Sequence, residues 1–200
     1  SQLRVALTGV DGPAGGHFAL FDNDGNAFLQ TFDGISGADV LLKPSYHAHF
    51  NWSFSRRGLW RVRMTVVGYR GPGLTNPTPV SGEVPLQFAI GNRAQWRADR
   101  FDAATVMDDV VAGDAADPDG DGLVNLVEYA LGGDPLGGVK PHPVSGEPVA
   151  VRGGRVESGG QEYLTITFHR RVAEPYPEIE YAVEWSDDLV PGLWSAGGSE

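Results

Sequence analysis

Six positions within residues 117–128 have the residue types and the spacing of a twelve-residue, EF-hand-like calcium loop. The segment reads DPDGDGLVNLVE and fits the pattern D-x-[DN]-x-[DN]-G-x5-E at every specified position. A loop around a hard cation must supply oxygen atoms at alternate residues. The predicted calcium ligands are five side chains and the main-chain carbonyl of the seventh residue: Asp117, Asp119, Asp121, Leu123 (the carbonyl), Asn125 and Glu128.

Each of these positions has an expected role. Glu128 closes the coordination shell with two oxygens, and Asn125 binds directly or through a water molecule. Gly122 permits the sharp turn at the sixth position. The alternative is an acidic turn without an ion, because Asp and Gly are common in loops. The complete set of ligand positions, the glycine and the helical pattern that follows together favour the calcium loop.

A second candidate metal site involves histidines. In an extended strand over residues 47–54, His47 and His49 point to the same face. Two such imidazoles can hold zinc or copper when a neighbouring strand supplies a third ligand, for which His17 is the candidate. The alternative is that the histidines hydrogen-bond to the main chain while the aromatic residues of the opposite face fill a core. No third ligand is fixed by the sequence, so both readings stay open.

Composition limits the classes of partner. The chain has 200 residues, 41% of them hydrophobic, which is enough for a sizeable core. Its formal charge of −11 argues against nucleic acid and anionic membranes as partners. No apolar run reaches the roughly 18 residues of a membrane span. There is no cysteine, which excludes disulfides and thiolate metal sites. A calcium loop can replace a disulfide as a staple in the calcium-rich exterior, so we expect an extracellular protein.

The elements that carry these sites predict a mainly β fold. Residues 1–93 contain short alternating segments divided by Gly, Pro and Asp turns, which predicts an antiparallel β-sandwich. Residues 94–135 are expected to form a joint in which a helix at 101–113 precedes the calcium loop and a second helix at 123–131 follows it. Ten carboxylates and one base lie between Asp99 and Asp134, so this joint should be looser without metal.

The C-terminal part of the chain is expected to be incomplete as a domain. Residues 136–160 are rich in Gly and Pro and are predicted to be a linker with one strand at 148–152. Residues 161–200 contain alternating strands at 162–169 and 178–186. Two or three strands cannot form a stable free-standing sheet. They should therefore pack on the first domain or pair with another copy, which in a head-to-tail arrangement gives a filament.

Two segments resemble known families. Residues 41–62 include His47-Ala48-His49-Phe50-Asn51-Trp52-Ser53-Phe54 and are similar to the central motif of the choice-of-anchor M, or actinobacterial surface-anchored protein, domain. That resemblance covers residues 1–93 and implies a secreted, surface-anchored bacterial β-sandwich. Residues 114–135 resemble calcium segments of bacterial exoproteins that are related to thrombospondin type 3 and dockerin loops. A dockerin carries two such loops and this chain has one, which argues against a cohesin-type partner.

The sequence thus predicts an extracellular, calcium-stabilised structural module whose partners are other copies of itself or other cell-surface components. One alternative is a surface domain that captures zinc or copper through His47, His49 and His17. Another is a glycan-binding module that uses exposed aromatics such as Trp96, Trp185 and Trp194. We expect no enzyme, because the chain has no nucleophile elbow, zinc-protease motif or phosphate-binding glycine loop.

Overall fold

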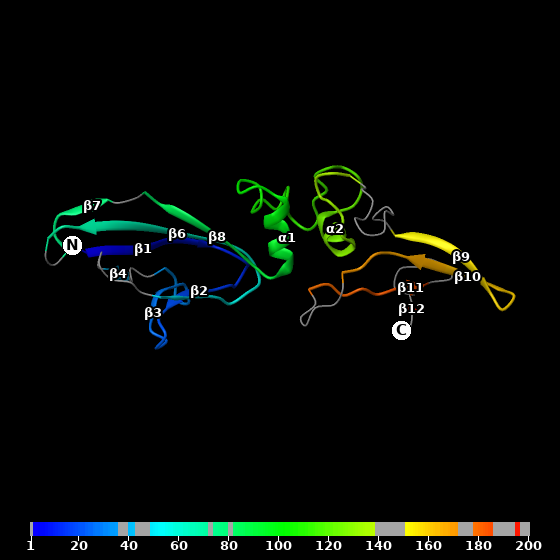
Figure 1. The fold of residues 1–200 in the computed structure, drawn as a ribbon, viewed down its shortest axis with the longest axis horizontal. Coiled ribbons are helices and arrows are strands. Elements are labelled where there is room, and N and C mark those ends of the chain that lie inside the picture. Colours follow the sequence, from blue (N-terminus) through cyan, green and yellow to red (C-terminus); the bar gives the residue numbers. More distant parts are fainter. Residues whose placement is uncertain are drawn as a thin grey trace. The chain divides into compact units, whose positions relative to one another are not determined.

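The chain folds mainly as antiparallel β-sheets, as predicted (Figure 1). The computed structural model describes residues 2–35, 40–42, 49–71, 74–79, 82–138, 151–171, 178–185 and 195–196. It divides into two compact units, residues 1–112 and 113–200. The boundary falls inside the segment 94–135 that was expected to form one joint.

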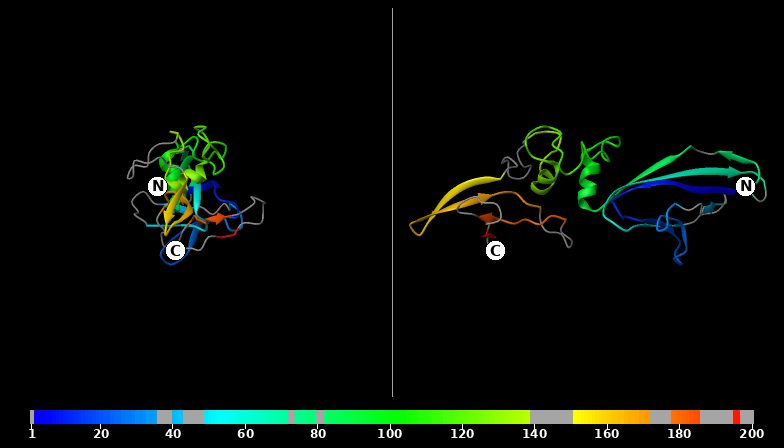
Figure 2. Two further views of the ribbon diagram at one scale, coloured as in Figure 1. Left: turned by 90° about the vertical axis from the view of Figure 1, so that its right-hand side faces the viewer. Right: turned by 180° about the vertical axis from the view of Figure 1, so that it is seen from behind.

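Two antiparallel sheets build the first unit. The larger sheet has the order β4 (Val40–Leu42), β1 (Gln2–Asp11), β6 (Gly58–Tyr69) and β7 (Pro77–Pro79), and β8 (Val84–Ile90) also pairs with β6. The smaller sheet has the order β3 (Ala27–Gln30), β2 (Phe18–Phe21) and β5 (Asn51–Phe54). The smaller sheet lies against one face of the larger sheet (Figures 1 and 2). This arrangement is the expected sandwich.

The sandwich core follows from the alternation along β6. Its buried residues Trp60, Val62 and Met64 alternate with the half-buried residues of the opposite face. They pack against apolar residues of the smaller sheet, chiefly Phe18 and Leu29. Burial of this apolar surface is the main favourable contribution to the stability of the unit.

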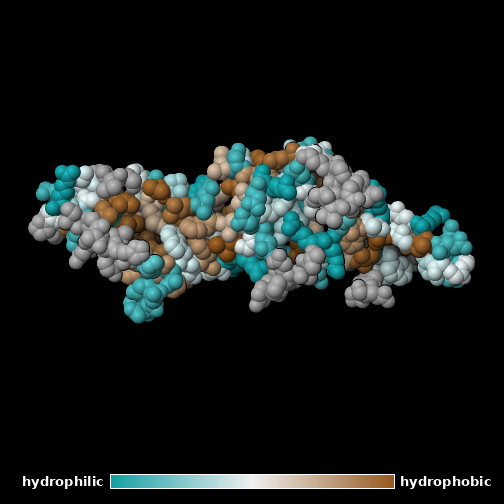
Figure 3. Space-filling model, in the orientation of Figure 1, coloured by the Kyte–Doolittle hydropathy of each residue, from teal (hydrophilic) through white to brown (hydrophobic). Residues whose placement is uncertain are grey.

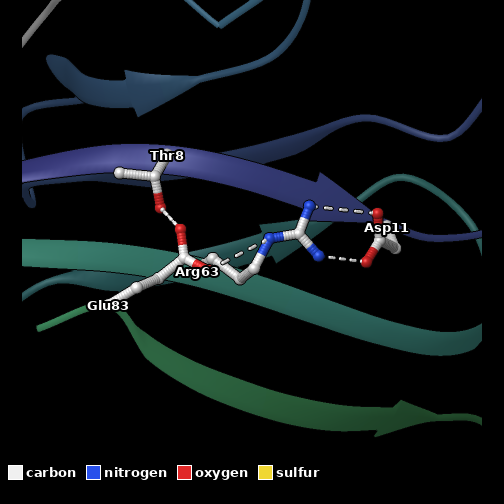
Figure 4. Close-up of polar contacts among 4 residues, drawn as sticks. All are labelled: Thr8, Asp11, Arg63 and Glu83. Carbon is white, nitrogen blue, oxygen red and sulfur yellow. Dashed lines mark hydrogen bonds and ion pairs between the residues drawn. The ribbon is translucent and has the colours of Figure 1, made fainter.

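A polar cluster on the outer face of the larger sheet fixes the geometry of a β-bulge (Figure 4). Arg63 donates to both carboxylate oxygens of Asp11 and lies 3.8 Å from a carboxylate oxygen of Glu83. Thr8 donates to the other oxygen of Glu83 at 2.7 Å. Gly9 lies opposite Arg63, and a Cβ there would approach the guanidinium to 2.3 Å. Ion pairs near the surface usually add little stability, and this one joins β1 to β6 beside the bulge.

The helix predicted at 101–113 is wrong. The helix of this region is α1 (Asn92–Arg100), and turns follow it. One reason is that Asp102 Oδ1 accepts hydrogen bonds from the main-chain N–H groups of Ala104 and Thr105, which competes with helical bonding. The apolar residues of this stretch are buried from within turns instead, and Phe101 is one of them.

The second unit contains the calcium-loop segment, helix α2 (Asn125–Leu131) and two small sheets. These sheets pair β9 (Arg152–Ser158) with β10 (Gln161–Thr167), and β11 (Glu184–Trp185) with β12 (Ser195–Ala196). The strand β10 was predicted. The strand predicted at 148–152 within the stretch 136–160 lies later in the chain, since β9 begins at Arg152 and ends at Ser158. Of the strand expected at 178–186, the described residues 178–185 contain only the two-residue strand β11.

The β9–β10 hairpin turns through Gly159 and Gly160, whose φ angles of 63° and 78° suit a tight two-residue turn. Its apolar side chains are exposed: Leu164 is 85% and Ile166 is 50% accessible. Apolar surface is visible in this region of the molecule in Figure 3.

Candidate metal centre

Three aspartates of the predicted loop lie together in the second unit. The carboxylates of Asp117, Asp119 and Asp121 each offer one oxygen, and these oxygens lie within 4.8 Å of one another. Within the described part of the chain, this is the one group of three or more potential ligand side chains at such spacing. An ion between them would therefore have three carboxylate ligands from alternate residues.

Hydrogen bonds within the loop give it this shape. The two carboxylate oxygens of Asp117 accept the N–H groups of Gly120 at 2.9 Å and Gly122 at 3.0 Å. Both glycines have left-handed φ angles, 73° and 91°, which side chains disfavour. Asp121 Oδ1 accepts the N–H of Leu123 at 2.8 Å. The turn expected at Gly122 is thus present, and carboxylate oxygens of the aspartates accept main-chain N–H groups of the loop.

The two predicted ligands on α2 are buried. Asn125 and Glu128 are each 1% exposed. The Asn125 side chain donates to the carbonyl of Gly113 at 2.7 Å, which ties the helix to the segment that enters the loop.

Two carboxylate oxygens in this region are buried without a hydrogen-bond donor: Asp121 Oδ2 and Glu128 Oε2. A buried polar atom without a partner is costly, and a charged one more so. A cation that reached both oxygens would satisfy both, although Glu128 is not in the group whose oxygens lie within 4.8 Å of one another. This is the observation by which the residues present fit a metal ion.

The electrostatics of Glu128 support the same reading. The pKa of its carboxyl group is raised to about 7, first by burial and then by the negative charges of Asp119, Asp121, Asp134 and Asp117, in that order of importance. Asp119 differs, because the N–H of Gly138 donates to its carboxylate and lowers its pKa. A bound cation would offset the repulsion that Glu128 experiences.

Glycines after α2 make room for Glu128. The helix ends at Gly132, whose φ of 84° and ψ of 28° are left-handed. The N–H groups of Gly132 and Gly133 both donate to the carbonyl of Glu128, at 2.8 and 2.7 Å. A Cβ at Gly133 would lie 3.0 Å from Glu128 Oε1, closer than ordinary contact. Sequence analysis did not single out Gly133 or Gly138, although the Gly-Gly pair after the helical pattern signals a helix end.

The histidine site is not assembled among the described residues. His47 lies outside them, and His49 is exposed and precedes β5, which begins at Asn51 rather than at 47. His17 Nδ1 lies 3.2 Å from the carbonyl oxygen of Thr31, and its ring stacks on Phe32 with centroids 5.1 Å apart. The zinc or copper pair therefore stays a prediction.

The aromatic residues named as glycan platforms have different environments. Trp96 of α1 is buried against Phe101, with ring centroids 6.4 Å apart, so it belongs to the core of the first unit. Trp185 in β11 is 56% exposed. Trp194 lies outside the described residues. Of the three, Trp185 is thus the one with an accessible ring in the described part of the chain.

Comparison with known proteins adds no family. The chain matches no protein-family model, no curated protein and no solved structure. The two resemblances drawn from its motifs accordingly stay hypotheses. Neither helix in the described ranges has the length and apolar content that a membrane span needs.

Proposed function

We propose that this protein is a calcium-stabilised, non-catalytic structural module. The observation that carries the proposal is the pair of buried carboxylate oxygens, Asp121 Oδ2 and Glu128 Oε2, that lack a donor beside a cluster of three aspartates. A bound ion would neutralise this cluster and join the loop to α2. The ion's role would be structural, since it fixes the path of residues 113–138.

The donor chemistry favours calcium among the common metals. The candidate ligands are all oxygens, which suits calcium and magnesium and disfavours zinc and copper. Calcium accepts six to eight oxygens in a flexible shell, including a bidentate carboxylate such as Glu128. Magnesium requires a near-ideal octahedron and keeps several waters, which fits a loop that delivers ligands from six residues less well.

Calorimetric titration of the purified chain with calcium tests this proposal. We expect one calcium ion to bind per chain, and magnesium to bind more weakly. We also expect chelation by EGTA to lower the melting temperature of the second unit, because a ligand that binds only the folded state stabilises it by mass action. No heat of binding, together with an unchanged melting curve after chelation, would refute calcium as a structural ligand.

We place this module outside the cell, as a component of a bacterial cell surface. A loop that uses calcium as a fixed staple needs the high calcium concentration of the exterior, and the chain carries no cysteine for a disulfide. The similarity of residues 41–62 to a surface-anchored domain points to the same location. Detection of the protein in the cell-surface fraction rather than the cytosol of its host tests the assignment.

Self-assembly is a second part of the proposal. The exposed Leu164 and Ile166 lie on one face of a two-stranded hairpin, and burial of such a face against another copy would stabilise both. Sedimentation at increasing protein concentration should then show association that is lost in a Leu164→Ser, Ile166→Ser variant. A wild-type chain that stays monomeric throughout would remove filament formation from the proposal.

Metal analysis of the purified protein distinguishes calcium binding at the loop from zinc or copper capture by the histidines. Binding of either metal at neutral pH, lost in a His47→Ala, His49→Ala variant and unaffected by Glu128→Gln, would favour the histidine pair. Calcium alone in the purified protein would favour the loop.

A further inference from the structure

The end of α2 is held by residues far along the chain within the second unit. Arg171 Nε donates to the carbonyl of Tyr129 at 2.5 Å, and its guanidinium lies 4.1 Å from the centre of the Tyr129 ring. The hydroxyl of Tyr181 donates to the carbonyl of Ala130 at 2.6 Å. The hydroxyl of Tyr129 in turn donates to Glu178 at 3.3 Å. The segments around Arg171 and Tyr181 thus converge on one turn of helix.

These contacts supply partners that the helix lacks. The last four carbonyls of an α-helix receive no hydrogen bond from an N–H group of the same helix. In α2 the glycines after the helix satisfy the carbonyl of Glu128, Arg171 satisfies that of Tyr129, and Tyr181 satisfies that of Ala130. Arg171 and Tyr181 therefore cap the C-terminal end of α2, although they lie 42 and 51 residues after the helix residues that they contact.

Helix α2 needs such support because it is short. It has seven residues, and helices of this length are unstable in water without tertiary contacts. The same turn carries Glu128, whose carboxyl group is affected by the charges of the aspartate cluster, and Tyr129, against whose ring the Arg171 guanidinium lies. Contacts that order this turn through Tyr129 therefore also order Glu128.

We propose that Arg171 and Tyr181 are positioning residues of the calcium site. Acting through α2, they hold Glu128 where it closes the loop, and calcium in turn orders the segments that bear Arg171 and Tyr181. The effect must be reciprocal, since two sites that bias one equilibrium are linked equally in both directions. The proposal rests on calcium binding at the loop, which is the proposed function.

Four single variants of the full chain test it. Arg171→Ala removes the cap on Tyr129, and Tyr181→Phe removes one hydroxyl and no carbon. Arg170→Ala and Tyr163→Phe are the matched controls: Arg170 is the exposed neighbour of Arg171, and the exposed Tyr163 bonds locally to Gln161. Calorimetry measures calcium affinity, and hydrogen exchange with mass spectrometry follows residues 161–171 and 178–185 with and without calcium.

We expect Arg171→Ala and Tyr181→Phe to bind calcium about fivefold or more weakly than the wild type, which is the lower range of coupling between linked sites. The controls should bind as the wild type does. Calcium should slow exchange at residues 161–171 and 178–185 in the wild type and in the controls, and less so in the two test variants. A contact that only stabilises the fold would lower the melting temperature without changing calcium affinity.

The outcomes separate this inference from the proposed function. A wild type that binds no calcium overturns both. A wild type that binds calcium, with unchanged affinity in Tyr181→Phe and no effect of calcium on exchange at 178–185, overturns the positioning role alone. If Arg171→Ala fails to fold, as judged by circular dichroism, Tyr181→Phe decides the matter because it removes a single oxygen atom.

Discussion

Replacing Glu128 with Gln is expected to weaken calcium binding by about a hundredfold or more. The substitution keeps the size of the side chain but removes its charge and one of the two oxygens that close the shell. Loss of groups that only support a metal ligand typically costs about 10–100-fold in affinity, so loss of a charged ligand should cost at least the upper end. Calorimetric titration with calcium measures the effect.

A matched control separates the effect of losing a calcium ligand from the effect of changing the net charge of the second unit. Glu162→Gln removes one negative charge from β10, where the carboxylate lies 3.5 Å from Arg155 on an exposed surface. Its calcium affinity should equal that of the wild type. Equal affinities for Glu128→Gln and the wild type would exclude Glu128 from the coordination shell.

Calcium affinity is expected to fall steeply as the pH is lowered from 8 to 6. The carboxyl group of Glu128 has a pKa of about 7 in the metal-free protein, and calcium requires its ionised form. Below pH 7 a proton competes with the ion, so the affinity should approach a tenfold loss per pH unit, as expected for release of one proton. Titrations at pH 8, 7 and 6 measure this, and an affinity independent of pH would contradict it.

The stability of the metal-free protein should fall as the pH rises, whereas the calcium affinity should increase. The folded pKa of Glu128 lies above its ordinary value of 4.5, so its protonated form is favoured by folding. The free energy of unfolding should therefore fall as the pH rises from about 4.5 to about 7. The lowered pKa of Asp119 acts in a different window, below 3.8. In Glu128→Gln the loss between pH 4.5 and 7 should disappear.

The sequence predicted the features that depend on neighbouring residues. The shape of the loop could be predicted because its candidate ligands lie within twelve residues, and local hydrogen bonds such as that from Gly122 to Asp117 fix the turn. The sandwich followed from the alternation of apolar residues on β6 and from the turn residues between strands. In both cases the spacing along the chain already determines the spacing in the folded protein.

Features that depend on distant contacts were missed or placed wrongly. The apolar spacing of 101–113 suggested a helix, but it reflects burial of separate turns whose main chain bonds to Asp102. The raised pKa of Glu128 depends on burial, which no residue pattern reports. The contacts of Arg171 and Tyr181 with α2 join residues 42 and 51 positions apart, and nothing in the type of either residue specifies that partner.

Burial of Glu128 has a consequence for the rate at which calcium, if bound as proposed, would leave. The side chain is 1% exposed, and a Cβ added at Gly133 would lie 3.0 Å from its Oε1, so Gly133 packs closely against it. If calcium binds as proposed, release of the ion from this buried carboxylate would require movement of the packed turn that carries Glu128. We would then expect calcium to exchange more slowly than it does from a site built of exposed carboxylates alone.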